Sequence, residues 1–169
     1  MYEIDEISEI IGIGAIIYND LSRSRTTNIY FDWDRMLNFE SGSAVYLQYT
    51  HVRIQSILKR LKVVFVEESE KAPDFNSIIF REKSEFVLAK ELAFFPQIIA
   101  NSQKLDAPHL ICTYLEQLAQ LFNGFYGEVS ILNTERKELR KSRILLIKSV
   151  AIVIRNGLSL LNIKIPEKM

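Results

Sequence analysis

Residues that interrupt helices and strands, or that cross-link the chain, are scarce in this sequence. It has one cysteine, four prolines and six glycines among 169 residues. The single cysteine, Cys112, excludes an internal disulfide framework and is typical of a reducing compartment, so we expect a cytoplasmic protein. Its apolar neighbours in the sequence favour a buried structural thiol over a nucleophile. No apolar run approaches the roughly 20 residues of a membrane span, and the acidic start lacks the basic residues of a signal peptide. We therefore expect no membrane partner.

The common motifs of catalysis and metal binding are also missing. The sequence has no GxxxxGK phosphate loop, no cysteine–histidine spacing for a metal, and no histidine paired with a plausible nucleophile. The string Gly12-Ile13-Gly14 lacks the third glycine of a nucleotide loop and sits inside a helical pattern, which indicates close helix packing. His51 and His109 have no carboxylate at ligand spacing, so both are expected to be structural or surface residues. We predict no catalytic residue, no metal site and no cofactor.

Charge is balanced over the whole chain but uneven along it. The sequence holds 21 basic and 21 acidic residues, a formal net charge of zero, whereas a dedicated nucleic-acid binder is usually basic. Residues 49–62 carry four basic side chains and no acidic one, and residues 135–155 carry seven basic against two acidic. These segments are either solvated helix faces or a local phosphate-binding face, and charge alone does not separate the two interpretations.

Hydrophobic residues make up 48% of the chain and recur with a helical period, which predicts an all-α fold. Asp32 is expected to cap a short helix that runs through Phe39, because its carboxylate can accept the free N–H groups of the first turn. Pro96 is expected to separate two helices, because the residue before a proline is pushed out of the α region. Asp106 is expected to cap the next helix, with Pro108 in its first turn. The other expected helices cover residues 3–21, 44–62, 81–94, 96–104, 107–127 and 134–161, and residues 63–79, which include the strand-like VVFV, form an irregular excursion.

An aromatic and basic stripe runs along the expected helix 44–62. Tyr46, Tyr49 and Arg53 occupy positions i, i+3 and i+7, so they share one side of the helix, beside the apolar face that holds Leu47 and Ile54. A tyrosine ring can stack on a splayed-out base, and a guanidinium can stack or bind phosphate. The alternative is that both tyrosines are half-buried at the edge of the core, and the spacing by itself favours this alternative.

Three segments carry a resemblance to a known family: FDWDRMLNFE (31–40), YLQYTHVRIQSIL (46–58) and the terminal NGLSLLNIKIPEKM (156–169). They resemble the C-terminal end of arginyl-tRNA synthetases, and the resemblance extends from about residue 10 to residue 169. It implies the DALR-type anticodon-binding helical bundle of class I aminoacyl-tRNA synthetases over residues 43–169, with residues 1–42 joining it to the catalytic core. The His-Ile-Gly-His-type and Lys-Met-Ser-Lys-type ATP motifs of that family do not occur here, so we expect this chain alone to lack ligase activity.

The resemblance also implies a partner, the anticodon loop of an arginine tRNA, and a set of contacts. In the family a helix with Tyr-x-x-Tyr-x-x-x-Arg spacing faces the anticodon loop, a Phe-Tyr pair borders it, and the terminal methionine lies near the loop bases. A Leu-Ser-x-x-Arg-like loop is expected at the inner side of the tRNA. Basic side chains of residues 53–60 and 136–143 are expected to contact phosphates. The predicted tRNA-binding residues are Tyr46, Tyr49, Arg53, Lys59, Arg60, Phe125, Tyr126, Met169, Arg23 and Arg25.

Two alternatives remain open at this point. The first is a free-standing RNA-binding or regulatory paralogue, which the zero net charge favours. Ser41 and Val45 also favour it, because the family tends to have glycine and proline at these positions. The second is a protein-interaction module in which an exposed apolar side of residues 3–17, or the VVFV segment, docks a catalytic subunit or a second copy.

Overall fold

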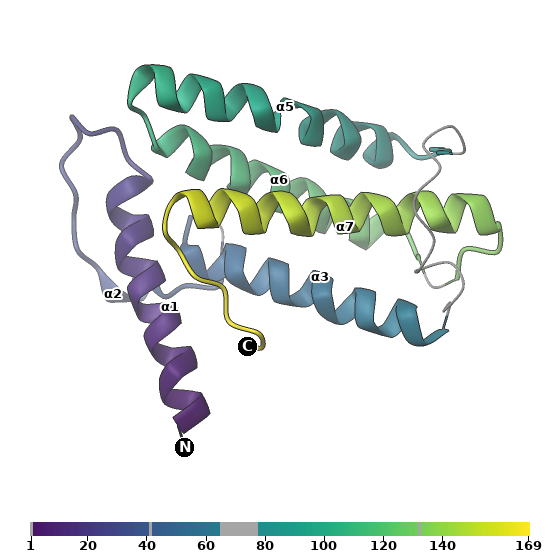
Figure 1. Cartoon of the computed structure of the whole chain (residues 1–169), viewed down its shortest axis with the longest axis horizontal. Helices are drawn as coiled ribbons and strands as arrows, with labels where there is room; N and C mark the ends of the chain where they lie inside the picture. The colour runs from purple at the N-terminus through teal and green to yellow at the C-terminus, as the bar shows by residue number, and fades with distance from the viewer. Residues whose placement is uncertain (1, 41, 65–77, 132) are drawn as a thin grey trace.

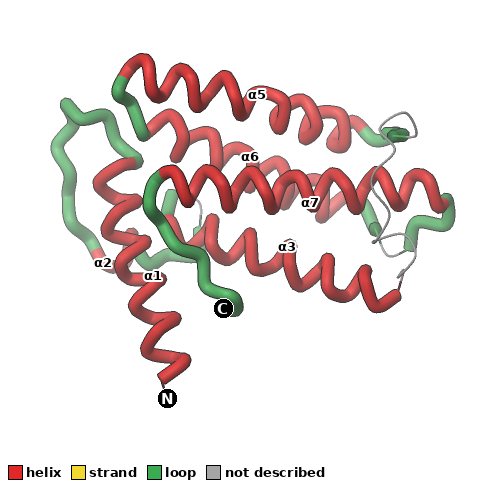
Figure 2. The backbone as a smooth tube through the Cα atoms, viewed as in Figure 1, coloured by secondary structure: helices red, strands yellow, loops and turns green. Residues whose placement is uncertain are grey.

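The computed structural model describes residues 2–40, 42–64, 78–131 and 133–169. These residues form six helices and no strand, which confirms the predicted all-α class. The predicted irregular excursion over residues 63–79 falls almost wholly outside the described residues, although α3 continues as far as Val64. The helices are α1 (Tyr2–Leu21), α2 (Trp33–Met36), α3 (Ala44–Val64), α5 (Lys83–Leu105), α6 (His109–Glu128) and α7 (Lys137–Leu160) (Figures 1 and 2).

Four long helices form a bundle, and α1 lies at one end of it (Figure 1). α5 packs on α6 and α7, and α3 packs on α7 and α6, so α3 and α5 occupy opposite sides of the bundle. The hydroxyl of Tyr18 on α1 donates a hydrogen bond of 2.5 Å to Oε1 of Glu116 on α6. Burial, followed by this bond, holds the pKa of the Tyr18 hydroxyl far above its ordinary value. The tyrosine therefore stays protonated and keeps α1 attached to the bundle.

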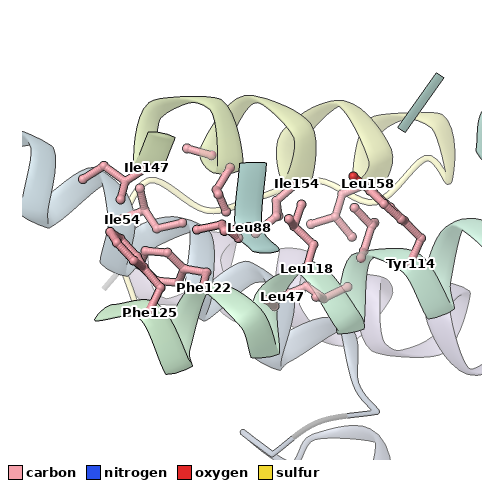
Figure 3. Close-up of a cluster of buried hydrophobic side chains, with 14 of the residues drawn as sticks. Leu47, Ile54, Leu88, Tyr114, Leu118, Phe122, Phe125, Ile147, Ile154 and Leu158 are labelled. Carbon is pink, nitrogen blue, oxygen red and sulfur yellow. The ribbon is translucent and has the colours of Figure 1, made fainter. Parts of the chain in front are cut away.

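The hydrophobic core lies between the four long helices α3, α5, α6 and α7 (Figure 3). Its members recur at helical spacing, which explains why the periodic pattern predicted these helices. Burying one such side chain fully stabilises a fold by about 1.5 to 3 kcal/mol. The fully buried side chains include Leu47 and Ile54 of α3, Leu118, Phe122 and Phe125 of α6, and Ile147, Ile154 and Leu158 of α7.

The C-terminal segment after α7 turns back onto α3 (Figure 2). Nε2 of Gln48 on α3 donates a 2.7 Å hydrogen bond to the carbonyl oxygen of Lys164. Gly14 of α1 makes room for this contact, because a Cβ there would lie 2.9 Å from Gln48 Nε2 and 3.2 Å from Ile163. The prediction of close packing is therefore confirmed at Gly14, whereas a Cβ on Gly12 would meet nothing within 4 Å.

Gly157 sets how closely α7 approaches α6. A Cβ at this position would lie 2.7 Å from Cδ2 of Leu115, which is itself fully buried. We expect Gly157→Ala to lower the free energy of unfolding by about 1 to 3 kcal/mol, the usual cost of adding a methyl group to a filled core. Gly124→Ala on α6 is the matched control, since a Cβ there meets nothing and alanine stabilises a helix by about 0.5 to 1 kcal/mol relative to glycine. Denaturant unfolding measures both changes, and a shift of the same sign in the two variants would contradict this assignment.

The predicted break at Pro96 is wrong, because α5 is continuous from Lys83 to Leu105. Pro96 is exposed, while Phe95 beside it packs inward. The ring of Phe95 stacks on Tyr114 of α6 with centroids 5.7 Å apart, and the Tyr114 hydroxyl donates to the carbonyl oxygen of Glu91 at 3.0 Å. Tertiary contacts thus hold the helix at the proline and outweigh the local preference.

The predicted role of Asp106 is also wrong. It ends α5 in the left-handed region, with φ 47° and ψ 47°, instead of capping α6, which follows Pro108 without a side-chain cap. The reason is a closing turn in which the N–H of Ala107 donates to the carbonyl of Ser102 at 2.9 Å. Asp32, in contrast, caps α2 as predicted, although that helix ends at Met36 and not at Phe39. α7 begins at Lys137, three residues later than predicted.

Candidate nucleic-acid interface

The tyrosine and arginine stripe lies on the outer side of α3. Tyr49 is 42% exposed, Arg53 is exposed and Tyr46 is half-buried. On the same helix Leu47 and Ile54 are fully buried against α6 and α7. The stripe therefore lies beside the buried face of α3, as the spacing predicts, with two of its three members open to solvent.

Asn123 of α6 joins the two ends of this stripe. Its Nδ2 donates a 2.8 Å hydrogen bond to the hydroxyl oxygen of Tyr46, and its Oδ1 accepts a 3.4 Å bond from Nη1 of Arg53. Because the Tyr46 oxygen accepts this bond, its own O–H remains able to donate to a bound molecule. Asn123 was not predicted as a site residue. Its position three residues before Tyr126 on one helix is the signal that could have identified it.

Tyr126 of α6 faces the arginine of the stripe. Cζ of Arg53 lies 5.2 Å from the centroid of the Tyr126 ring, within the range of a cation–π contact. The ring stacks in turn on Phe122, with centroids 5.9 Å apart, and Phe122 is fully buried. Tyr126 is thereby anchored to the core on one side and holds a guanidinium on the other.

An aromatic contact extends the set beyond α3 and α6. The ring of Phe39, in the connection between α2 and α3, meets Tyr49 edge-on with centroids 5.8 Å apart, and Phe39 is 59% exposed. We refer to Tyr46, Tyr49, Arg53, Asn123 and Tyr126 as the tyrosine–arginine cluster. It combines exposed aromatic surface, one cation and unused hydrogen-bond donors, which is the chemistry that binds unstacked nucleotides.

The other predicted residues of the bundle differ in how near they lie to the tyrosine–arginine cluster. Phe125 is fully buried, because it continues the inward face of α6 that Leu118 and Phe122 begin, so it has no surface to offer RNA. Arg60, seven residues after Arg53, is exposed on the same side of α3. Lys59 lies on another side of α3, in a groove with α7 and the C-terminal segment. Met169 is 39% exposed at the end of that segment.

The predicted loop contacts lie at a different end of the bundle. Nη1 of Arg25 is 3.9 Å from Oδ2 of Asp106, at the turn between α5 and α6. Arg23 is half-buried and lines a small cavity together with Ser22, Arg35 and residues of α1. No contact among the described residues joins either arginine to the tyrosine–arginine cluster.

The predicted phosphate-binding segment 136–143 needs a correction at Arg143. This side chain is buried, and its Nε donates to Oε1 of Glu85 at 2.6 Å, while its Nη1 donates to Oγ1 of Thr134 at 2.8 Å. Burial alone would raise the pKa of Glu85. The N–H groups of Arg81 and Glu82, followed by the Arg143 guanidinium, outweigh burial and hold that pKa below its ordinary value. The pair is ionised and structural, so Arg143 is unavailable to RNA.

Sites of other kinds do not emerge from the part of the chain that the structure describes. No cluster of three or more histidine, cysteine or acidic side chains is placed to hold a metal ion there. Within the same ranges, every helix is too short or too polar to cross a membrane. Cys112 is buried, and burial, followed by the charge of Glu116, raises the pKa of its thiol to about 12. It is therefore an inert thiol, as expected.

Comparison with known proteins gives a consistent family. A family model described as the DALR anticodon binding domain matches residues 47–169. The arginine–tRNA ligase of Buchnera aphidicola is 44% identical over 164 residues, which are 97% of this chain and 27% of that protein. The arginine–tRNA ligase of Thermococcus kodakarensis is 44% identical over 99% of this chain and 26% of its own length. This chain thus spans about a quarter of the curated relatives it matches.

Solved structures agree with the sequence matches. The Thermus thermophilus arginyl-tRNA synthetase superposes with a TM-score of 0.85 at 27% identity, over 97% of this chain and 27% of that one. The Plasmodium falciparum arginyl-tRNA synthetase superposes with a TM-score of 0.84 at 26% identity, over 98% of this chain and 28% of that one. The helical bundle, the family match over residues 47–169 and the relatives together show that this chain belongs to the DALR anticodon-binding domain family of arginyl-tRNA synthetases.

Proposed function

We propose that this chain binds tRNA through the anticodon stem-loop and is the anticodon-recognition part of an arginyl-tRNA synthetase. The observation that carries the proposal is the exposed tyrosine–arginine cluster on α3 and α6. The relatives that this chain matches are named as arginine–tRNA ligases and are about four times longer. The ligase reaction is therefore assigned to the rest of such an enzyme, and a catalytic synthetase domain is a second proposed partner.

The cluster suits an RNA loop because loop bases are unstacked and accessible. Tyr49 presents an aromatic ring on which one base can stack, a contact that works with any base. Arg53, held between Tyr126 and Asn123, presents its guanidinium at a fixed place where it can bind phosphate or stack. The Tyr46 hydroxyl can donate to an acceptor on a base edge. Aromatic stacking supplies affinity, and the hydrogen bonds favour particular bases.

An arginine tRNA is the expected ligand. Direct titration of the chain with an arginine tRNA and with an unrelated tRNA of the same length tests this expectation. We expect tighter binding of the arginine tRNA, because the hydrogen-bonding groups of Asn123 and Tyr46 favour particular loop bases. Equal affinity for the two would favour the alternative of a free-standing RNA-binding or regulatory paralogue. No affinity for either would favour a protein-interaction module.

Substitution of Arg53 tests whether this side chain binds RNA or only stabilises the fold. We expect Arg53→Ala to weaken tRNA binding and to reduce the slope of log affinity against log salt by about 0.7, the value for one single-strand phosphate contact. The free energy of unfolding should fall by at most about 1 kcal/mol, because the cation–π contact to Tyr126 is at an exposed site. Arg81→Ala removes an exposed charge at the start of α5 and is the matched control, which should bind normally. Lost stability with intact binding would show that Arg53 only pairs α3 with α6.

A further inference from the structure

A groove runs beside α3 on the side away from Tyr126. Its larger part, about 830 Å³, is enclosed by α3, the end of α7 and the C-terminal segment 162–167, with Ile10 of α1 at one edge. A smaller part of about 210 Å³ continues between α3 and α7. His51, Gln55 and Arg155 line both parts, so the two form one depression along the α3–α7 seam. We call it the α3–α7 groove.

The charged side chains that line the α3–α7 groove are predominantly cationic. Lys59 of α3, Arg155 of α7 and Lys164 of the C-terminal segment line the larger part, and Lys148 lines the smaller one. Glu167 is the one carboxylate among the described residues of either lining. Within the same described part of the chain, Lys59, Arg155 and Lys164 make no ion pair within 4.0 Å, and all three are exposed. A chain of zero net charge thus concentrates positive charge here.

His51, which lines both parts of the groove, has a pKa that reflects burial and the nearby positive charge. Burial, followed by the charge of Arg155, holds the pKa of His51 below its ordinary value. The imidazole is therefore neutral near pH 7, and it adds no charge of its own. Lys59, Arg155 and Lys164 are exposed, whereas His51 and Gln55 are half-buried and Val52 and Ile163 are buried, so the groove presents its cations on the solvent side, where they can meet a ligand whose negative charges lie on its outside.

The α3–α7 groove and the tyrosine–arginine cluster lie along opposite edges of the exposed side of α3, and Lys59 is the exposed groove residue nearest to the cluster's side. Lys59 follows Tyr49 by ten residues, which corresponds to about 15 Å along the axis of α3 and a rotation of about 80°. One extended ligand can therefore reach both. Stacking of bases on tyrosine leaves the sugar–phosphate strand beside the ring, on the exposed surface of α3 that leads to Lys59.

We propose that the α3–α7 groove binds backbone phosphates of the RNA whose loop bases reach the tyrosine–arginine cluster. This inference rests on the proposed function and adds a second contact surface to it. Lys59, Arg155 and Lys164 pair with phosphate oxygens and set the register of the strand, while the cluster contacts the bases. The groove supplies affinity that depends on salt and is independent of base sequence.

The test is the triple variant Lys59→Gln/Arg155→Gln/Lys164→Gln in the full chain, titrated with the same arginine tRNA from about 50 to about 200 mM salt. Three lost single-strand contacts should reduce the slope of log affinity against log salt by about 2. The loss of affinity relative to the unchanged chain should then be roughly twentyfold larger at the lower salt concentration than at the higher one. An unrelated tRNA should lose the same factor, since phosphates are common to all sequences.

Lys83→Gln/Lys90→Gln/Lys104→Gln is the matched control, because it removes the same charge from exposed positions of α5, on the opposite side of the bundle. It should leave the slope nearly unchanged, and unfolding curves of both triple variants should overlay that of the unchanged chain. Equal slope changes in the two triple variants would show that the total charge of the chain, and not the groove, sets the salt dependence, and would overturn the inference. An unchanged slope in the groove variant, in a chain that still binds tRNA through Tyr49, would overturn the inference alone. Failure of the unchanged chain to bind any tRNA would overturn the proposed function and the inference with it.

Discussion

Replacing Glu85 by alanine should lower the free energy of unfolding by about 3 to 5 kcal/mol, the cost of leaving one member of a buried ion pair without its partner. The Glu85 side chain has no exposed surface, and it is the acceptor for Nε of Arg143 at 2.6 Å. Its other oxygen accepts the N–H groups of Arg81 and Glu82 at 2.6 and 2.9 Å, so the same change removes the side chain that closes the start of α5. Urea unfolding at neutral pH measures the loss.

Two further measurements identify the cause. Glu85→Leu/Arg143→Met removes both charges together and should recover part of the loss, because an apolar pair of similar volume leaves no buried charge unpaired. Acid should act in the same direction as the single substitution. The folded pKa of Glu85 lies below its unfolded value, so its contribution is present above the unfolded pKa and disappears as the pH falls through the folded one. A loss below about 1 kcal/mol in the single variant, typical of solvent-exposed pairs, would show that water compensates Arg143.

Replacing Tyr49 by alanine should weaken tRNA binding by roughly ten- to a hundredfold, because an aromatic ring stacked on a base contributes about 1 to 3 kcal/mol. Tyr49→Phe should keep most of the affinity, since stacking uses the ring and the hydroxyl makes no hydrogen bond to another described residue. The ring is 42% exposed, so the alanine variant should remain folded. Fluorescence titration with a labelled anticodon stem-loop measures binding, and thermal unfolding measures the effect on the fold.

Tyr114 is the contrasting tyrosine. It is buried, it stacks on Phe95, and its hydroxyl donates to the carbonyl of Glu91, so Tyr114→Ala should destabilise the bundle by several kcal/mol through an internal cavity. If Tyr49→Ala behaves like Tyr114→Ala, melting the bundle while its folded fraction binds RNA normally, then Tyr49 is a packing residue and the stacking role is wrong.

The helical periodicity of the sequence was sufficient to predict most of the helices and to place the stripe of Tyr46, Tyr49 and Arg53 on one side of α3. A helix fixes which residues share a side, so the spacing of Tyr46, Tyr49 and Arg53 is enough to place them together. The same rule would have placed Phe125 inside, since Leu118, Phe122 and Phe125 recur at spacings of four and three. The family resemblance led to its inclusion as a contact, and the structure shows a core residue.

The Asp106 error has a local cause, the turn between Ser102 and Ala107, but other errors involve residues that are far apart in sequence. α5 continues through Pro96 because Phe95 and Glu91 on the same helix contact Tyr114. Arg143 is withdrawn from the basic surface because Glu85, 58 residues away, binds it. Asn123 belongs to the cluster through bonds to residues 70 and 77 positions earlier. Local patterns carry no information on such pairs. These distant pairs nevertheless decide which of the predicted basic residues remain available to bind RNA.

The bond between Tyr18 and Glu116 attaches the C-terminal half of α1 to α6. α1 is also in contact with α3 and α6, so its direction relative to the tyrosine–arginine cluster is fixed by the fold. Under the proposed function, a domain joined to the start of α1 would therefore meet the RNA at a fixed direction from the loop base that stacks on Tyr49.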